Sequence, residues 1–382
     1  MSTLKTAKNV LFELKKAGYE AYIVGGAVRD HLLKMPSNDI DITTNAKPFE
    51  VSKIFRTIPT GIKYGTVTVL YKTEKFEVTT YRIDGTYTNL RHPDQVTYSD
   101  SVIEDVKRRD FTINGLLMDE RLQVIDHVDG RIDLKNKMIR TIGDPKQRFE
   151  EDALRMLRAF YFQSKLGFQI EKETRTAIED LRENLKNVSS ERILNEMIKI
   201  IQGPHAKKAY KSMVTTKVHE VLPGLKKGLA YIQNMEEMPF VDPFFIMCFA
   251  LNDGVIPKAW SFSNKHRHRY QQAATLANMN PEFDAYILYT YGLDLCLTAN
   301  KVNHMLGRSE NLRSEIEQTY KNLPIQSELD LKLRATEIMQ ITGKKAGAWL
   351  KDIQQEMVLK ILKNELKNDK DMLKSYIIEH VK

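Results

Sequence analysis

The fold is decided by residues 22–44, which read YIVGGAVRDHLLKMPSNDIDITT. The apolar residues 22–24 predict a short strand that leads into Gly25-Gly26, and a helix is expected after the two glycines. Residues 39–44 alternate between polar and apolar side chains with a period of two, which is typical of a half-buried strand. The stretch therefore predicts strand, glycine turn, helix and strand, the beginning of an α+β domain.

The same stretch carries residues suited to phosphate and metal binding. Gly25 and Gly26 follow a strand, so backbone N–H groups can approach a phosphate at the positive end of the next helix. Arg29 can reach the same phosphates through a charge-assisted pair. Asp39 and Asp41 are two apart on the expected strand, so both carboxylates should share a face and attract a hard cation such as Mg²⁺. Each feature alone is common, but together they favour a nucleotide site.

Two further strands and a loop are expected in the first part of the chain. Residues 66–71 and 76–81 repeat the period-two alternation and suggest a hairpin. Glu77 is a third candidate carboxylate if its strand lies beside residues 39–44, and a solvent-facing glutamate is the equal alternative. The polar segment 84–98 is expected to be a long mobile loop.

Beyond residue 145 the pattern changes to helical periodicity. Asp144 is suited to cap a helix that starts at Pro145. Helices are expected, for example, over residues 152–162, 191–201 and 311–322. The sequence therefore predicts an α+β head followed by an all-α remainder.

Two more clusters have chemical potential. In the run Arg108-Arg109-Asp110-Phe-Thr-Ile-Asn114, Arg109 could hold phosphates, Asp110 could accept a bond from a ribose hydroxyl, and Asn114 could support that geometry. A cluster of charges on a helix surface is the alternative.

The second cluster is Glu151-Asp152-Ala-Leu-Arg155, with Arg158 one turn further on. On one helix, Asp152 and Arg155 would share a face, and an acceptor beside a donor can imitate the edge of a base. The alternative is an ordinary ion pair between Glu151 and Arg155.

Composition bounds the class of protein. The chain has 382 residues, a net charge of +8, 42% hydrophobic and 28% charged residues, which excludes a disordered or fibrous protein. The apolar run 244–251 is far short of the roughly 20 residues that span a bilayer, so no membrane is expected. Cys248 and Cys296 lack metal-ligand spacing, and the start of the chain does not read as a signal peptide, so a reducing cytoplasm is expected. Fifteen of the 20 arginines lie in residues 1–192, so the nucleotide chemistry is expected there.

The ordered motifs resemble those of the class II tRNA nucleotidyltransferases, the bacterial CCA-adding enzymes of the poly(A) polymerase superfamily. The resemblance implies a polymerase-β-like nucleotidyltransferase head over residues 1–145, a base-recognising neck over 146–205, a helical body over 206–310 and a tRNA-binding tail over 311–382. It implies addition of C, C and A to the tRNA 3′ end from CTP and ATP without a nucleic-acid template. Pyrophosphate would be released by a two-metal mechanism with Mg²⁺.

The resemblance also implies roles for individual residues. Asp39 and Asp41 would hold the catalytic metal ions, and Asp152 with Arg155 would pair with the base of CTP or ATP. Because the pocket must change between C and A addition, we also hypothesise that the loop 84–98 acts as a lever that reorients that pair for ATP. The full set of expected nucleotide-binding residues is Gly25, Gly26, Arg29, Arg109, Asp110, Asn114, Asp152, Arg155 and Arg158. Body and tail would hold the acceptor arm of tRNA.

Some rival interpretations stay open at this stage. A bacterial poly(A) polymerase shares the head motifs, and an enzyme that adds only A is not excluded. A non-catalytic RNA-binding module is disfavoured because Arg29, Asp39 and Asp41 are all present. One departure from the family is Tyr161, which stands where relatives often carry an arginine, so a ligand contact at this position is an open question.

Overall fold

The computed structural model describes residues 2–37, 39–84 and 96–381. The chain forms two compact units, one of Met1–Met238 with Ala259–Ser261 and one of Pro239–Lys258 with Phe262–Lys382. The predicted boundaries near residues 145, 205 and 310 divide the chain more finely and stay a prediction.

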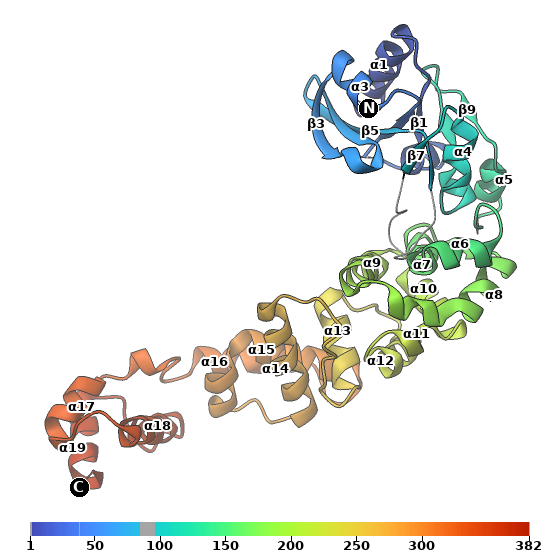
Figure 1. Ribbon diagram of the computed structural model, residues 1–382. Helices are drawn as coiled ribbons and strands as arrows, with labels where there is room; N and C mark the ends of the chain where they lie inside the picture. The colour runs from blue at the N-terminus through green and yellow to red at the C-terminus, as the bar shows by residue number, and fades with distance from the viewer. Residues whose placement is uncertain (1, 38, 85–95, 382) are drawn as a thin grey trace. The chain divides into compact units, whose positions relative to one another are not determined.

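Within its described residues, the first unit contains a seven-stranded mixed sheet, two small strand pairs and twelve α-helices, whose arrangement is drawn in Figure 1. Its strands are β1 (Ala21–Val24), β2 (Asp41–Thr44), β3 (Arg56–Gly61), β4 (Thr66–Tyr71), β5 (Glu74–Thr80), β6 (Arg82–Asp84), β7 (Val96–Tyr98), β8 (Leu117–Met118), β9 (Val124–Ile125), β10 (Met138–Ile139) and β11 (Gln169–Ile170). Its helices are α1 (Ser2–Lys16), α2 (Gly26–Leu32), α3 (Pro48–Ile54), α4 (Val102–Lys107), α5 (Gly130–Lys135), α6 (Pro145–Glu151), α7 (Leu154–Leu166), α8 (Lys172–Leu181), α9 (Ser190–Gln202), α10 (Ala206–Thr215), α11 (Val218–Val221) and α12 (Lys226–Ile232).

The order of strands in the large sheet is β3-β4-β5-β2-β1-β8-β9. Strands β1 and β2 pair antiparallel with Val24 opposite Asp41, and β2 and β5 pair parallel with Asp41 opposite Glu77. The end of β1 and the start of β2 therefore meet at one edge of the sheet. That edge places the glycine turn at Gly25 beside the aspartates that follow α2.

Helices cover the sheet with apolar side chains. Val10, Leu11 and Leu14 of α1 are fully buried, and this helix contacts β1 and β5. Val106 of α4 belongs to a second cluster of buried side chains together with Val24 of β1. Burying apolar surface on both sides of β1 fixes the strand that leads into the glycine turn.

The predicted strands are confirmed with small shifts at their ends. Strand β2 begins at Asp41, so Asp39 precedes the strand instead of belonging to it. Strands β4 and β5 form the predicted hairpin. The predicted loop 84–98 is shorter than expected, because its two ends pair as β6 and β7. The hypothesis of a lever in this loop concerns residues 85–95, which lie outside the described residues.

The connection from head to helices corrects one prediction. Asp144 caps α6 as expected, since its Oδ1 accepts a bond from the Gln147 N–H at 2.8 Å. Asp152, however, is extended and ends α6, and α7 starts only at Leu154. The Asp152 Oδ1 accepts a bond from the Leu154 N–H at 3.1 Å, a local contact that competes with helix formation. The prediction that Asp152 and Arg155 share a helix face is therefore wrong.

A short strand is also present beyond residue 145, where only helices were expected. Strand β11 pairs parallel with β10, so Ile170 lies opposite Ile139. Both isoleucines are buried. This pair ties the start of the helical region to the end of the head.

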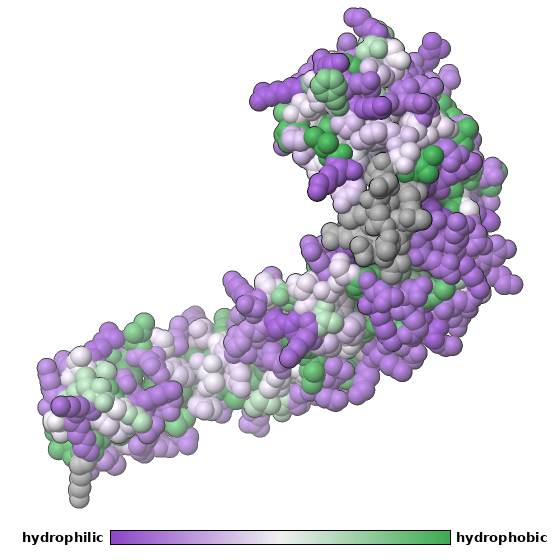
Figure 2. All heavy atoms as spheres, viewed as in Figure 1, coloured by the Kyte–Doolittle hydropathy of each residue, from purple (hydrophilic) through white to green (hydrophobic). Residues whose placement is uncertain are grey.

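The second unit is built from helices. They are α13 (Val241–Ala250), α14 (Asn264–Met279), α15 (Ala285–Met305), α16 (Arg313–Lys321), α17 (Ala335–Thr342), α18 (Ala348–Leu362) and α19 (Lys370–His380). Among the described residues, no helix is long and apolar enough to cross a membrane. On the face seen in Figure 2, hydrophilic side chains predominate and apolar ones are scattered.

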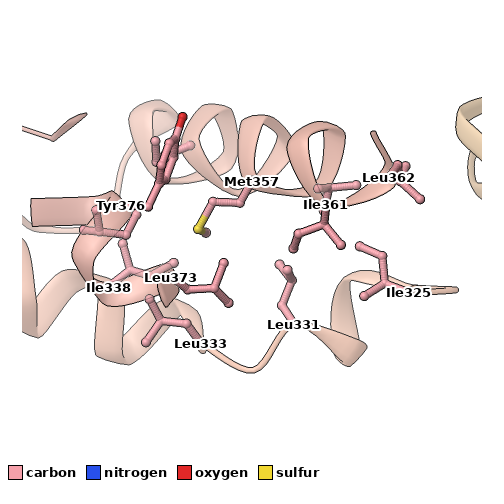
Figure 3. Close-up of a cluster of buried hydrophobic side chains, with 12 residues drawn as sticks. Ile325, Leu331, Leu333, Ile338, Met357, Ile361, Leu362, Leu373 and Tyr376 are labelled. Carbon is pink, nitrogen blue, oxygen red and sulfur yellow. The ribbon is translucent and has the colours of Figure 1, made fainter. Parts of the chain in front are cut away.

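Residues near the C-terminus have their own apolar core. Met357 and Ile361 of α18 point toward Leu331 and Leu373 (Figure 3). Met357 and Leu373 are fully buried. This packing gives helices α17–α19 a common core independent of the sheet.

Candidate active site

A cavity of about 560 Å³ lies at the edge of the sheet where β1 ends and β2 begins. The predicted site residues that line it are Gly25, Gly26, Arg29, Asp39, Asp41, Arg109, Asp110, Asn114 and Arg158. It is also lined by Asp30, Pro36, Ser37, Tyr161, Phe162, Lys165 and Lys199. The structure thus gathers residues from α2, α7, α9 and the segment after α4 around one volume.

The glycine turn is required by backbone geometry. Gly25 has a φ of +74°, which is unfavourable for a residue with a side chain. A Cβ added here would also stand 3.4 Å from Nη1 of Arg109. The absence of side chains at Gly25 and Gly26 leaves room for an anion beside this guanidinium.

Arg29 is held rigidly in the wall of the cavity. It is only 3% exposed, its Nη1 donates to Oδ1 of Asn114 at 2.6 Å, and its Nε donates to Oδ1 of Asp30 at 2.8 Å. The other oxygen of Asp30 pairs with Nζ of Lys165 of α7 at 3.1 Å. Asp30 thus connects α2 to α7, a role that its place in the motif did not reveal.

Asp110 forms the second anchor between these parts of the molecule. Its Oδ2 accepts a bond from Nε of Arg158 at 2.7 Å, and its Oδ1 accepts from Nδ2 of Asn114 at 3.0 Å and from the Phe111 N–H at 2.8 Å. Burial by itself would raise the pKa of Asp110, but the charge of Arg158 and these hydrogen bonds lower it below its usual value. Asp110 is therefore ionised at neutral pH.

Arg109 is positioned by a residue that the sequence interpretation missed. Asp105 is fully buried, and its Oδ2 accepts from Nη2 of Arg109 at 3.2 Å and from Oγ1 of Thr43 at 3.0 Å. Burial works to raise the pKa of Asp105, and the charges of Arg109 and Arg108 outweigh it and lower the pKa. The spacing of four residues between Asp105 and Arg109 was the signal that could have found this pair.

The carboxylates at the edge of the sheet suit a divalent cation. Asp41 is exposed at this edge, but desolvation by the neighbouring protein atoms raises its pKa, and the charges of Glu77 and Asp39 raise it further against the opposing effect of Arg109. A cation would relieve this repulsion between oxygens of the kind that Mg²⁺ prefers. In the described part of the chain, no three acidic, histidine or cysteine side chains form a complete metal-ligand group. The remaining ligands would thus come from substrate phosphates and water.

Phe162 of α7 lies between two arginines of the cavity. Its ring centre is 5.2 Å from Cζ of Arg29 and 5.3 Å from Cζ of Arg158, and the ring of Phe111 meets it edge-on at 5.6 Å. Guanidinium groups are attracted to aromatic faces. Phe162 therefore positions both arginines, a role for which the sequence offered no prediction.

We expect the substitution Phe162→Leu to raise the KM for nucleotides about thirtyfold, because two cation–π contacts worth about 1 kcal/mol each are lost. Steady-state kinetics and thermal unfolding would be measured together. Phe160→Leu is the matched control, since Phe160 is fully buried on the same helix but does not line the cavity. Both variants should lower Tm, and an unchanged KM in Phe162→Leu would contradict the positioning role.

Asp152 and Arg155 do not line this cavity and do not contact each other through their side chains. Oδ2 of Asp152 accepts from Nη2 of Arg192 at 2.7 Å, whereas Nη1 of Arg155 donates to Oε2 of Glu151 at 2.7 Å. Arg155 is buried, at 7% exposure. The ion pair between Glu151 and Arg155, the alternative interpretation of this motif, is thus present. Selection of the base by Asp152 and Arg155 stays a prediction.

Three family models match successive parts of the chain. "Poly A polymerase head domain" matches residues 21–140, "Probable RNA and SrmB- binding site of polymerase A" matches 167–229, and "tRNA nucleotidyltransferase domain 2 putative" matches 244–377. The CCA-adding enzyme of Listeria monocytogenes serotype 4b is 38% identical over 97% of both chains. The CCA-adding enzyme of Bacillus cytotoxicus is 35% identical over 99% of both chains.

Solved structures show the same similarity. The Bacillus stearothermophilus CCA-adding enzyme in complex with CTP is 32% identical, covers 98% of this chain and 96% of its own, and has a TM-score of 0.82. The Thermotoga maritima CCA-adding enzyme complexed with tRNA shares the fold at 18% identity, with a TM-score of 0.64 over 98% and 94% of the two chains.

Proposed function

The chain belongs to the CCA-adding enzymes, and from that premise we propose that its 560 Å³ cavity transfers nucleotides from CTP and ATP to the 3′ end of tRNA. The observation that carries this assignment is the meeting of the Gly25 turn, Arg29 and the pair Asp39 and Asp41 at one cavity. A phosphate-binding turn beside metal-binding carboxylates is what nucleotidyl transfer requires.

Nucleotidyl transfer joins the 3′-hydroxyl oxygen of tRNA to the α-phosphorus of the nucleotide. The bond from that phosphorus to the bridging oxygen breaks, and pyrophosphate leaves. The chain contributes mainly positioning and charge neutralisation. We assign the triphosphate to the backbone of Gly25 and Gly26 and to the guanidinium groups of Arg29 and Arg109.

Members of this family use divalent metal ions, and we propose Mg²⁺ as the ion here. Asp39 and Asp41 would hold it, and Glu77, directly opposite Asp41 on β5, is the further carboxylate within reach of this edge. When bound, the ions would activate the attacking hydroxyl and neutralise the charge on the leaving pyrophosphate. Desolvation and the negative charges of Glu77 and Asp39 raise the pKa of Asp41, which supports this assignment because a cation would relieve the repulsion among these carboxylates.

The ribose and the base need separate recognition. The ionised Asp110 would accept a bond from a ribose hydroxyl, while Asn114 and Arg158 hold its carboxylate in place. We further propose that Asp152 and Arg155 select the base by exchanging their present partners, Arg192 and Glu151, for the base edge. This exchange would leave the number of charged hydrogen bonds roughly constant.

The substitution Asp152→Ala tests this selection. It should reduce the preference for CTP and ATP over UTP and GTP by about tenfold, because the acceptor that a wrong base cannot satisfy is gone. Incorporation of each nucleotide would be measured in competition. Asp180→Ala, which removes the partner of Lys146 from an exposed ion pair of the same unit, is the control. Unchanged selectivity in Asp152→Ala would reduce the residue to a salt-bridge partner of Arg192.

The assignment of function has a direct test. The protein would be incubated with tRNA that ends before CCA and, in a parallel reaction, with tRNA that ends in CC. Each reaction contains Mg²⁺ and each labelled nucleotide alone and in combination, and the expected products below refer to the first tRNA. We expect two C residues with CTP, and a terminal A only when CTP and ATP are both present. Long A tails would indicate a poly(A) polymerase, A on tRNA that already ends in CC but no C addition would indicate an A-adding enzyme, and no incorporation would indicate a non-catalytic module.

Partners and location follow from the substrate. We assign the tRNA acceptor arm to the lysine-rich helical regions after residue 206, where binding should weaken as salt rises. We place the enzyme in the cytoplasm, which is consistent with the free thiols of Cys248 and Cys296.

A further inference from the structure

Lys199 is a cation of the cavity that the nucleotide-binding motifs do not include. It lies on α9, and its Nζ stands 5.6 Å from the centre of the Tyr161 ring of α7. Both side chains line the cavity that contains Gly25 and Asp41. A lysine and a tyrosine from two helices therefore meet at the helical part of the cavity wall.

Two contacts hold the ammonium group of Lys199 in this place. The face of the Tyr161 ring attracts it. Oε2 of Glu196, one turn earlier on α9, accepts a bond from Nζ at 3.2 Å. A lysine without such contacts extends its head group into water. Here the ring and the carboxylate keep the charge at the cavity.

Lys199 also differs from the other cations of the cavity in its exposure. Its side chain is 49% exposed, compared with 3% for Arg29, 18% for Arg109 and 29% for Lys165. Arg158, which pairs with Asp110, is 34% exposed. Because the Lys199 side chain is the most exposed of these cations, a new anion can approach it with the least desolvation.

The carboxylate beside Lys199 accepts one bond from its ammonium group. Glu196 is 3% exposed, and its Oε1 has no hydrogen-bond partner among the described residues. Glu196 also interacts electrostatically with Arg158, which pairs with Asp110. Glu196 thus orients the Lys199 ammonium from behind, and the remaining donors of that group stay available.

We propose that Lys199, held over Tyr161, binds a phosphate group on the helical side of the cavity. The inference rests on the proposed function, because it adds a contact to the same site. The ligand is a tetrahedral phosphate anion, which a lysine binds as a point charge. It belongs either to the nucleoside triphosphate or to the phosphodiester near the RNA 3′ end, and the two sources share this chemistry.

The variant Lys199→Met tests the proposal, because it keeps the length of the side chain and removes the charge. We expect the KM for the phosphate-bearing substrate to rise about tenfold, as for the loss of one charge-assisted contact. Lys186→Met is the matched control, since Lys186 forms an exposed i,i+3 pair with Glu183 and does not line the cavity. A higher KM for CTP and ATP assigns the triphosphate, and a higher KM for tRNA assigns the RNA backbone.

Rescue separates a charge effect from a packing effect. In the background of Lys199→Met, the second substitution Tyr161→Arg places a guanidinium on the same wall. The KM should then return to within about threefold of the wild-type value. A merely structural loss at Lys199 would not be repaired by a second change at its contact. Failure of the rescue together with a lowered Tm in Lys199→Met would overturn the proposal.

Equilibrium binding makes the outcome independent of turnover. Binding of CTP in the presence of Mg²⁺, and binding of tRNA, would be measured for the wild type and Lys199→Met. If the wild type adds no nucleotides but the variant binds CTP or tRNA more weakly, the proposed function fails and the phosphate contact stands. If both affinities and both KM values are unchanged, the phosphate contact is refuted.

Discussion

Asp41→Ala should lower kcat for both C and A addition by about a thousandfold or more while tRNA binding persists. Asp41 stands at the first position of β2, beside Asp39 and opposite Glu77, so its carboxylate is the central oxygen donor of this edge. Removing it would leave the proposed Mg²⁺ with fewer ligands, so less of the charge of the leaving pyrophosphate would be neutralised. Single-turnover addition and tRNA gel shifts would be compared, with Asp180→Ala as the surface control.

The raised pKa of Asp41 predicts the direction in which Mg²⁺ affinity and protein stability change with pH. Desolvation by neighbouring protein atoms, followed by the charges of Glu77 and Asp39, raises that pKa, so in the absence of metal the carboxyl takes up a proton at a higher pH than usual. Mg²⁺ needs the ionised form, and its affinity should thus fall as the pH drops through the raised pKa, with proton release on binding. For the same reason, ionisation of Asp41 makes the metal-free protein less stable as the pH rises through this range. A Mg²⁺ affinity that does not change with pH, or turnover near the wild-type level in Asp41→Ala, would remove Asp41 from the metal site.

Arg29→Lys should lower kcat/KM for CTP and ATP by about a hundredfold and also lower Tm. The charge is kept, but a lysine cannot donate to Asn114 and Asp30 while presenting further donors to a phosphate. A buried carboxylate at Asp30 that loses part of its hydrogen bonding also destabilises the fold, by roughly 1–3 kcal/mol.

The control for this prediction is Arg140→Lys. Arg140 pairs with Asp133 in the same unit, is half exposed and does not line the 560 Å³ cavity, so its kinetics should stay close to wild type. Activity of Arg29→Lys within threefold of wild type would show that the several N–H donors of the Arg29 guanidinium are not required. It would also indicate that the triphosphate binds elsewhere.

Local patterns were sufficient to predict the head. The stretch 22–44 contains its own turn, helix start and strand, so short-range preferences determine where Gly25, Arg29 and Asp41 lie. Asp39 was misplaced by only two residues relative to the strand, and it still reaches the cavity. Glu77 was predicted as a third carboxylate on the condition that its strand lies beside residues 39–44. That condition is fulfilled, because β5 pairs with β2.

The interactions that sequence reasoning missed depend on long-range contacts. Lys165 meets Asp30 from 135 positions away, and Arg158 meets Asp110 from 48. No periodicity encodes such partners. The position of Asp152 relative to the helix was predicted wrongly for a different reason. Its side chain accepts a hydrogen bond from the backbone N–H two residues ahead, and this local bond competes with the helical conformation.

The ion pairs that join α2 and the Asp110 segment to α7 carry a consequence for product release. Arg29, Arg158 and Lys165 already have carboxylate partners before any polyphosphate arrives. The phosphates of an arriving nucleotide must share these cations with the carboxylates or displace the carboxylates from them. Part of the attraction between phosphates and cations is therefore spent on breaking existing ion pairs and does not contribute to the affinity. The same competition acts on pyrophosphate after the reaction, when the carboxylates can reclaim their cations. The internal ion pairs of the empty cavity should therefore favour dissociation of pyrophosphate between successive additions, because they form again when the product leaves.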